Sequence, residues 1–236
     1  MAPLIAIIGC DGSGKSTLAA DITALLAETR PTETCYLGLG SGTIGAKIRE
    51  WPLIGPAIEH RLASKASKTR SRDERVPGMA TALIVYGFSL LRRRRFERVL
   101  ALRSAGVTVV TDRYPQIQVP GFYDGPGLSA ARAGTKAIAR LAATERQMYE
   151  RMAAYQPTLV IRLNVDLATA AARKPDHDVA LLERKIAVTP LLTLGGAPIV
   201  DLDSRAPYAQ VRQQALAAIR DAIGETVQAS PYGKSP

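Results

Sequence analysis

The feature that most constrains this chain is a glycine-rich loop between an apolar run and a helical pattern near the N-terminus. The loop reads Gly9-Cys10-Asp11-Gly12-Ser13-Gly14-Lys15-Ser16-Thr17, which matches the spacing of Gly, four residues, Gly, Lys and Ser or Thr. Residues 4–8 before it are apolar and mostly branched, as expected of a buried parallel strand. Leucine and isoleucine recur at helical spacing between residues 18 and 26. The pattern predicts a strand–loop–helix unit that binds phosphate. An ordinary glycine-rich turn is the alternative, but it would not require the strand, the loop spacing and the helix to occur together.

Each part of this loop suits phosphate chemistry. Glycines let backbone N–H groups turn toward phosphate oxygens, and the helix N-terminus adds a partial positive charge. Lys15 supplies a full positive charge, and the Ser16 hydroxyl is placed to bind Mg²⁺. We therefore expect ATP and Mg²⁺ as the bound cofactors. The residues expected to bind the nucleotide are Gly12, Ser13, Gly14, Lys15, Ser16 and Thr17.

Strand and helix patterns alternate along the rest of the chain. The expected strands are residues 4–8, 34–39, 107–111, 159–163 and 199–201. The expected helices follow the loop, cover about 78–104 and 129–155, begin at 167, and cover 208–226. Such alternation predicts an α/β fold: a five-stranded parallel sheet flanked by helices on both faces. Ligands in these sheets bind at the carboxyl ends of the strands.

The 236 residues suit one domain, which we place at residues 1–228 with a flexible tail at 229–236. Met1-Ala2-Pro3 leads into the first strand without a signal peptide, and the longest apolar stretch, 80–91, is too short to span a bilayer. The two cysteines make no disulfide framework. These features predict a cytoplasmic protein.

A net charge of +10 indicates an anionic partner. The basic residues gather at 65–75 and at 92–95. Aromatic residues make up only 5% and do not interleave with these clusters, which argues against nucleic acid. Peripheral membrane contact through the basic cluster beside residues 80–91 stays open, although a helix apolar on most sides is more simply a core helix. We expect a small anionic molecule as the partner.

A second charged motif, Asp112-Arg113-Tyr114, ends the predicted strand at 107–111. Asp112 would face the phosphate loop across the sheet, within reach of Mg²⁺ or an attacking hydroxyl. Arg113 presents a planar fork suited to two oxygens of one phosphate. A strand-end salt bridge between Asp112 and a basic neighbour is the simpler alternative.

With these two motifs the chain resembles the thymidylate kinase family of nucleoside monophosphate kinases. The resemblance depends on residues 9–17, with their acidic Asp11, and on Asp112-Arg113-Tyr114; segments 156–166 and 199–203 are similar to the fourth and last strands of that family. It covers most of the chain. It implies a P-loop kinase fold with a short lid at about residues 173–185, and it allows a homodimer through the helix at 78–104.

The resemblance also implies roles for single residues. Lys15 would bridge the β- and γ-phosphates of ATP, while Ser16 and Asp112 would hold Mg²⁺. Asp11 would lie near the acceptor hydroxyl. Arg113 would clamp the acceptor phosphate.

Three further residues receive roles in the same way. Tyr114 would lie with Arg113 at the acceptor, and Arg92 would reach the acceptor from the preceding helix, while most of residues 92–95 are solvated. Arg173 would close over the transferring phosphoryl group from the lid, with Arg184 as a second candidate. The alternative for Arg173 is a basic turn at a helix C-terminus, where cations are favourable in any case.

The segment after Tyr114 departs from the thymidylate kinase pattern. It runs through two prolines to Tyr123 and Asp124, where that family has a small polar stretch and Gln-Gly. The expected activity is therefore ATP-dependent phosphoryl transfer to a small acceptor, with a nucleoside monophosphate first. A nucleoside, a sugar or another anionic metabolite remains an alternative acceptor, and a regulatory P-loop protein with slow hydrolysis remains an alternative function.

Overall fold

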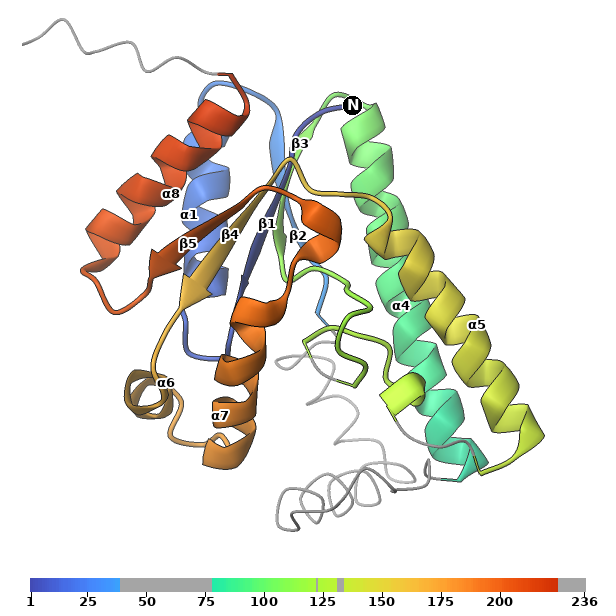
Figure 1. Ribbon diagram of the computed structural model, residues 1–236. Coiled ribbons are helices and arrows are strands. Elements are labelled where there is room, and N and C mark those ends of the chain that lie inside the picture. The colour runs from blue at the N-terminus through green and yellow to red at the C-terminus, as the bar shows by residue number, and fades with distance from the viewer. Residues whose placement is uncertain (39–77, 122, 131–133, 225–236) are drawn as a thin grey trace, which may run out of the picture.

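A five-stranded parallel sheet forms the centre of the protein (Figure 1). The computed structural model describes residues 1–38, 78–121, 123–130 and 134–224. The strand order within this part is β2-β3-β1-β4-β5. The strands are β1 (Leu4–Gly9), β2 (Thr32–Tyr36), β3 (Thr108–Asp112), β4 (Leu159–Asn164) and β5 (Ile199–Asp203).

Helices cover both faces of this sheet. Helices α1 and α8 lie on one face, and α4 and α5 lie side by side on the other (Figure 1). The short helices α6 and α7 lie at the carboxyl ends of the strands. The helices are α1 (Lys15–Ala27), α4 (Met79–Ser104), α5 (Lys136–Ala153), α6 (Leu167–Arg173), α7 (Val179–Val188) and α8 (Tyr208–Ala222). Three 3₁₀ turns join them: η1 (Leu128–Ala130), η2 (Thr189–Leu191) and η3 (Leu194–Gly196).

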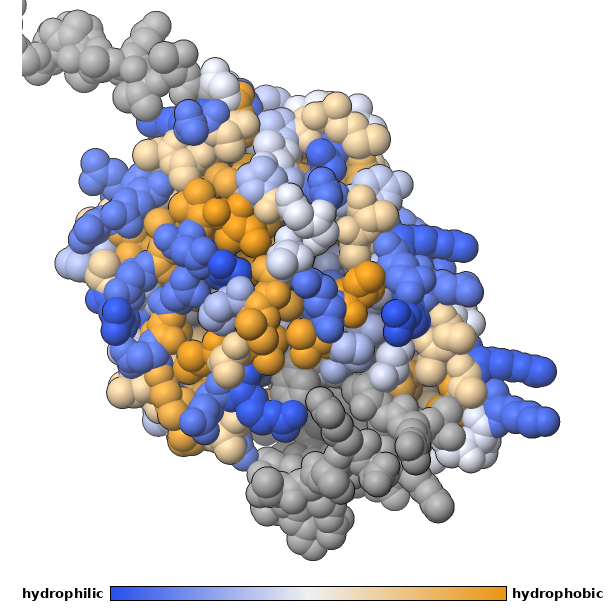
Figure 2. Space-filling model, in the orientation of Figure 1, coloured by the Kyte–Doolittle hydropathy of each residue, from blue (hydrophilic) through white to orange (hydrophobic). Residues whose placement is uncertain are grey.

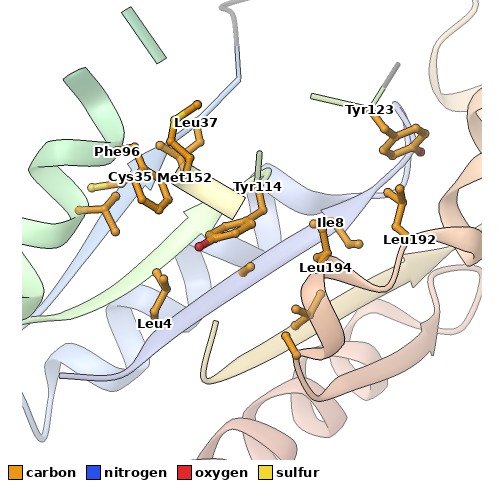
Figure 3. Close-up of a cluster of buried hydrophobic side chains, with 14 of the residues drawn as sticks. Leu4, Ile8, Cys35, Leu37, Phe96, Tyr114, Tyr123, Met152, Leu192 and Leu194 are labelled. Atoms are coloured by element: carbon orange, nitrogen blue, oxygen red, sulfur yellow. The ribbon is translucent and has the colours of Figure 1, made fainter. Parts of the chain in front are cut away.

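The central strand β1 shows why the sheet needs helices on both faces. Leu4, Ala6 and Ile8 belong to the core under α4 and α5, part of which Figure 3 shows. Ile5 and Ile7 belong to the core under α1 and α8. Successive side chains of a strand point to opposite faces, so a run that is apolar at every position must be covered twice.

The register of the strands brings the two sequence motifs together. Ile7 of β1 pairs with Asp112 of β3, and Gly9 of β1 pairs with Leu163 of β4. The Arg113 N–H donates to the Ile7 carbonyl at 3.0 Å. Parallel pairing thus places the start of the phosphate loop beside the end of β3.

The predicted α/β architecture, with the sheet and helices of a P-loop kinase fold, is confirmed. Two helix boundaries were wrong. Helix α5 begins at Lys136 rather than near 129, because the Thr135 hydroxyl caps it by accepting from the Ile138 N–H. Helix α8 ends at Ala222, and Gly224 follows with a φ of 71°. The basic cluster at 65–75 and the predicted tail at 229–236 lie outside the described residues.

No helix in the described ranges is long and apolar enough to cross a membrane. On the face in Figure 2, hydrophobic residues gather over α7 and the segment that follows it. Val179, Leu181 and Leu191 are exposed there. Hydrophilic residues project along α5.

Candidate phosphate-binding and acceptor site

The phosphate loop turns between β1 and α1 on glycines that no other residue could replace without strain. Gly14 stands before α1 with a φ of 86°, and no side chain caps this end of the helix. A Cβ on Gly9, whose φ is 152°, would lie 2.7 Å from the Leu163 carbonyl oxygen. The loop therefore follows β4 closely and leaves the N–H groups of the first turn of α1 open to an anion.

Lys15 is almost fully buried within this loop. Its Nζ donates to the Cys10 carbonyl at 2.6 Å, so the side chain folds back along the loop. Burial, together with the nearby charge of Arg113, lowers the pKa of Lys15 to about 8, although Asp11 and Asp112 act in the opposite direction. An entering phosphate would bring negative charge to this buried ammonium group, whose one hydrogen bond within the described residues is to the Cys10 carbonyl.

The other predicted nucleotide contacts lie around the same turn. Ser13 is buried, and its hydroxyl has no hydrogen-bond partner among the described residues. Ser16 and Thr17 are exposed on the first turn of α1. A loop of this shape offers backbone donors, one ammonium group and three hydroxyls to a polyphosphate.

Ser16 and Asp112 form the part of the site that fits a divalent cation. The Ser16 hydroxyl donates to Asp112 Oδ2 at 2.6 Å. Asp112 is buried, and its Oδ1 has no hydrogen-bond partner within the described ranges. An orphaned carboxylate oxygen beside a hydroxyl suits Mg²⁺, which takes one or two protein oxygens and completes its shell with water and phosphate. The described chain holds no cluster of three or more acidic, His or Cys groups, so phosphate oxygens would have to complete this shell.

Arg113 and Asp11 pair directly above the loop. Arg113 Nη2 lies 2.9 Å from Asp11 Oδ1. The other Asp11 oxygen accepts from Lys185 of α7, a residue that the sequence interpretation missed. Burial opposes ionisation of Asp11, but Lys185 and Arg113 hold its pKa well below the usual range. The sequence signal for Lys185 was weak, because Arg184 stands beside it and only the rotation of α7 decides which residue meets Asp11.

Asp124 links Arg113 to Arg92. Its Oδ1 lies 2.5 Å from Arg92 Nη2, and its Oδ2 lies 3.5 Å from Arg113 Nη1. Arg113, Tyr123 and Asp124 all have positive φ values, 76°, 50° and 64°. Non-glycine residues adopt this conformation at a cost, and such residues cluster at functional sites.

The structure gives Arg92 extensive internal contacts. Its side chain is fully buried, and it donates to the Leu37 carbonyl, the Asp124 carbonyl, the Asp124 carboxylate and the Tyr149 hydroxyl. Arg93 and Arg94 are exposed, as expected of solvated positions. The contact between Arg92 and the acceptor stays a prediction.

Tyr114 and Arg173 have different surroundings, the first in the core and the second at the phosphate loop. The Tyr114 ring packs edge-on against Phe96 at 5.8 Å, over the sheet in Figure 3, and its hydroxyl donates to the Tyr155 carbonyl. Arg173, at the end of α6, donates to the Gly12 carbonyl at 3.2 Å and to the Ser204 carbonyl at 2.9 Å. Arg173 thus connects the predicted lid segment to the phosphate loop and to the end of β5.

Comparison with known proteins shows which family the chain belongs to. No protein-family model matches the chain. "Uncharacterized ATP-binding protein YghR" of Escherichia coli strain K12 is 48% identical over 217 residues, which is 92% of this chain and 86% of YghR. "Uncharacterized ATP-binding protein YghS" of the same strain is 47% identical over 221 residues, which is 93% of each chain. The chain belongs to the family of YghR and YghS.

In this member of the YghR and YghS family, two chemically different half-sites meet at one edge of the sheet. The phosphate loop, Ser16 and Asp112 offer backbone donors, an ammonium group and a carboxylate oxygen, which would suit a polyphosphate and a hard cation. Asp11, Arg113 and Asp124 form a charged half-site on the other side of Lys15. Such an edge can bring two molecules together end to end.

Proposed function

We propose that this protein is a P-loop kinase that transfers the γ-phosphoryl group of ATP to a small acceptor. The relatives YghR and YghS are named ATP-binding proteins, which supports ATP as the nucleotide. The observation that favours phosphoryl transfer over nucleotide binding alone is the Asp11–Arg113 pair beside Lys15. A protein that only binds nucleotide has no need of a second charged half-site in contact with its phosphate loop.

In the proposed reaction the chain acts by positioning and by charge. Lys15 and the N–H groups of α1 hold the phosphates in line with the acceptor. Ser16 and Asp112 would hold Mg²⁺, which would neutralise charge on the phosphate oxygens. Arg173 of α6 and Lys185 of α7 contact the loop and would help to keep it in place.

The resemblance to thymidylate kinases and the geometry support different acceptors. A nucleoside monophosphate follows from the Asp112-Arg113-Tyr114 motif, with Arg113 as its clamp. A nucleoside, a sugar or another small molecule follows from the Tyr123–Asp124 segment, because Asp124 already occupies one side of Arg113.

We predict that Lys15→Ala lowers phosphoryl transfer at least about 100-fold, since it removes the full charge from the phosphates. The measurement is ADP formation from ATP in the presence and absence of a mixture of nucleosides, nucleoside monophosphates and sugars. Lys136→Ala, at the exposed start of α5, is the matched control and should keep full activity.

The result separates kinase from regulatory function. Acceptor-dependent ADP formation that Lys15→Ala abolishes supports the proposal. Slow ADP formation that no acceptor accelerates would instead support a regulatory ATPase. Normal transfer by Lys15→Ala would exclude the assigned role of Lys15.

A further inference from the structure

Five side chains of alternating charge form a continuous series of ion pairs beside the phosphate loop. The series runs Arg92, Asp124, Arg113, Asp11 and Lys185. It begins on α4, passes the end of β3 and the phosphate loop, and ends on α7. Its three cations and two carboxylates leave one positive charge. Each guanidinium group of the series that could clamp an acceptor phosphate is nevertheless already paired with a carboxylate of this chain.

Arg92 holds Asp124 in place on this site. Arg92 Nη1 donates to the Asp124 backbone carbonyl at 2.8 Å, and Nη2 donates to its carboxylate. The Asp124 side chain is 10% exposed. The φ of Asp124 is 64°, a strained value for a residue other than glycine, and the contacts with Arg92 help to hold it. Contacts to both the backbone and the side chain make this carboxylate a built-in part of the site.

A small cavity separates Asp124 from the phosphate loop. Its volume is about 10 Å³. Lys15, Arg113 and Asp124 are the charged residues of its lining, and Ile8, Gly9, Tyr114, Tyr123, Leu192 and Leu194 complete it. A cavity of this size holds one water-sized oxygen group. A tetrahedral phosphate at this place would meet the carboxylate of Asp124, whereas a hydroxyl would fit and could donate to it.

We propose that Asp124 selects an acceptor whose reacting end is an uncharged hydroxyl, as in a nucleoside or a sugar, and rejects a phosphate monoester. The inference rests on the proposed phosphoryl transfer. A dianionic phosphate that binds Arg113 would have to displace the carboxylates of Asp124 and Asp11 from this guanidinium group and break their ion pairs. A hydroxyl leaves every ion pair of the series intact.

The chemistry of this step balances without another reactant. The hydroxyl oxygen forms a bond to the γ-phosphorus, and the bond from that phosphorus to its bridging oxygen breaks. ADP leaves with the bond electrons, and the hydroxyl proton passes to solvent. The product is a phosphate monoester, whereas a nucleoside monophosphate acceptor would yield a phosphoanhydride.

The net charge of +10 is compatible with an acceptor that reacts through an uncharged hydroxyl. Net charge acts over the whole surface and steers anions toward a protein, which serves ATP as well as any acceptor. Selection at the reacting atom depends on the groups within a few ångströms, and there Arg113 is already paired with both Asp124 and Asp11.

The test compares matched acceptors with the full-length protein and MgATP. Each pair contains one molecule with and without its phosphate: thymidine and thymidine monophosphate, the corresponding adenosine, guanosine and cytidine pairs, and glucose and glucose 6-phosphate. Phosphorus NMR of the products distinguishes a new monoester from a new anhydride. We expect kcat/KM to be at least about 100-fold higher for an unphosphorylated member than for its phosphorylated partner.

Variants then assign this preference to Asp124. Asp124→Asn keeps the size and removes the charge, and should shift the ratio of kcat/KM at least about tenfold toward the phosphorylated member. Asp124→Glu keeps the charge and should keep the preference. Glu33→Gln is the matched control, because Glu33 pairs with the exposed Arg98 near the amino end of β2, away from this site. Thermal unfolding of each variant checks that it folds.

Each outcome has one meaning. Monoester products with the expected shift in Asp124→Asn support the inference. Anhydride products, or equal use of both members, overturn it and leave the proposed kinase function standing. An unchanged preference in folded Asp124→Asn overturns the role of Asp124. No product from any acceptor overturns the kinase function, and the inference with it.

Discussion

Lys15 shows how one residue can be recognised from sequence while its chemistry depends on its surroundings. The loop spacing alone predicts that Lys15 binds phosphate. Burial and the charge of Arg113, which lies far away in the sequence, bring its pKa down to about 8. The free protein thus keeps this ammonium group close to its point of deprotonation.

We predict that ATP affinity falls as the pH rises through about 8. Above this pH the free protein holds Lys15 neutral, and binding must first protonate it, which weakens affinity about tenfold by pH 9. Titration calorimetry at pH 7 and pH 9 measures the change. Lys15→Arg stays charged at both values and should lose the dependence.

Deprotonation of Lys15 affects the free energy of unfolding in the opposite direction to ATP affinity. The unfolded chain keeps the Lys15 proton up to its ordinary pKa of 10.5, so this group makes the free energy of unfolding rise between about pH 8 and 10.5. An ATP affinity that is equal at pH 7 and pH 9 would contradict the lowered pKa.

At the scale of elements, Arg92 joins four segments that are distant in sequence. It extends from α4 to the end of β2 at Leu37, to the loop at Asp124, and to α5 at Tyr149. The sequence shows four consecutive arginines and cannot say which one is buried. Successive residues on a helix point about 100° apart, so the packing of α4 decides between them.

We predict that Arg92→Lys lowers the free energy of unfolding by about 3 kcal/mol, because an ammonium group cannot replace the planar fork and leaves buried acceptors unpaired. Urea denaturation followed by circular dichroism measures this change. Arg94→Lys, on the exposed side of the same helix, is the control and should change stability by less than about 0.5 kcal/mol. Equal stability of the two variants would remove the structural role assigned to Arg92.

The boundaries of the elements were predictable where a local signal exists. The strand at residues 4–8 was predicted because every position is apolar, and β1 covers it. The start of α5 was missed because the sequence from 129 onward contains helix-forming alanines, while the Thr135 hydroxyl and the Gly134 before it decide where the helix begins. A cap is a single hydrogen bond, which composition over a window does not resolve.

At the scale of the whole molecule, the site exists only because three distant segments meet at one edge of the sheet. The phosphate loop follows β1, Asp112 and Arg113 follow β3, and α6 and α7 follow β4. Ion pairs and hydrogen bonds from Arg113, Lys185 and Arg173 connect these segments to the loop. A ligand that binds the loop should therefore stabilise the entire fold.

We predict that MgATP at about 100 times its Kd raises the free energy of unfolding by about 2.7 kcal/mol through binding to the folded state alone. Thermal unfolding with and without MgATP measures the shift. Lys15→Ala should lose most of it at the same ligand concentration. A shift that ATP gives equally to Lys15→Ala would place the nucleotide elsewhere on the molecule.

The sequence by itself determined the class of fold and predicted the polyphosphate half-site. Both depend on local patterns: apolar strands, helical spacing, and a loop whose function follows from nine consecutive residues. Only the tertiary structure decided the other half-site. The pairing of Asp11 with Lys185, and of Asp124 with Arg92 and Arg113, joins residues more than 30 positions apart in most cases. Charges pair through space, and chain folding alone determines which carboxylate reaches which cation.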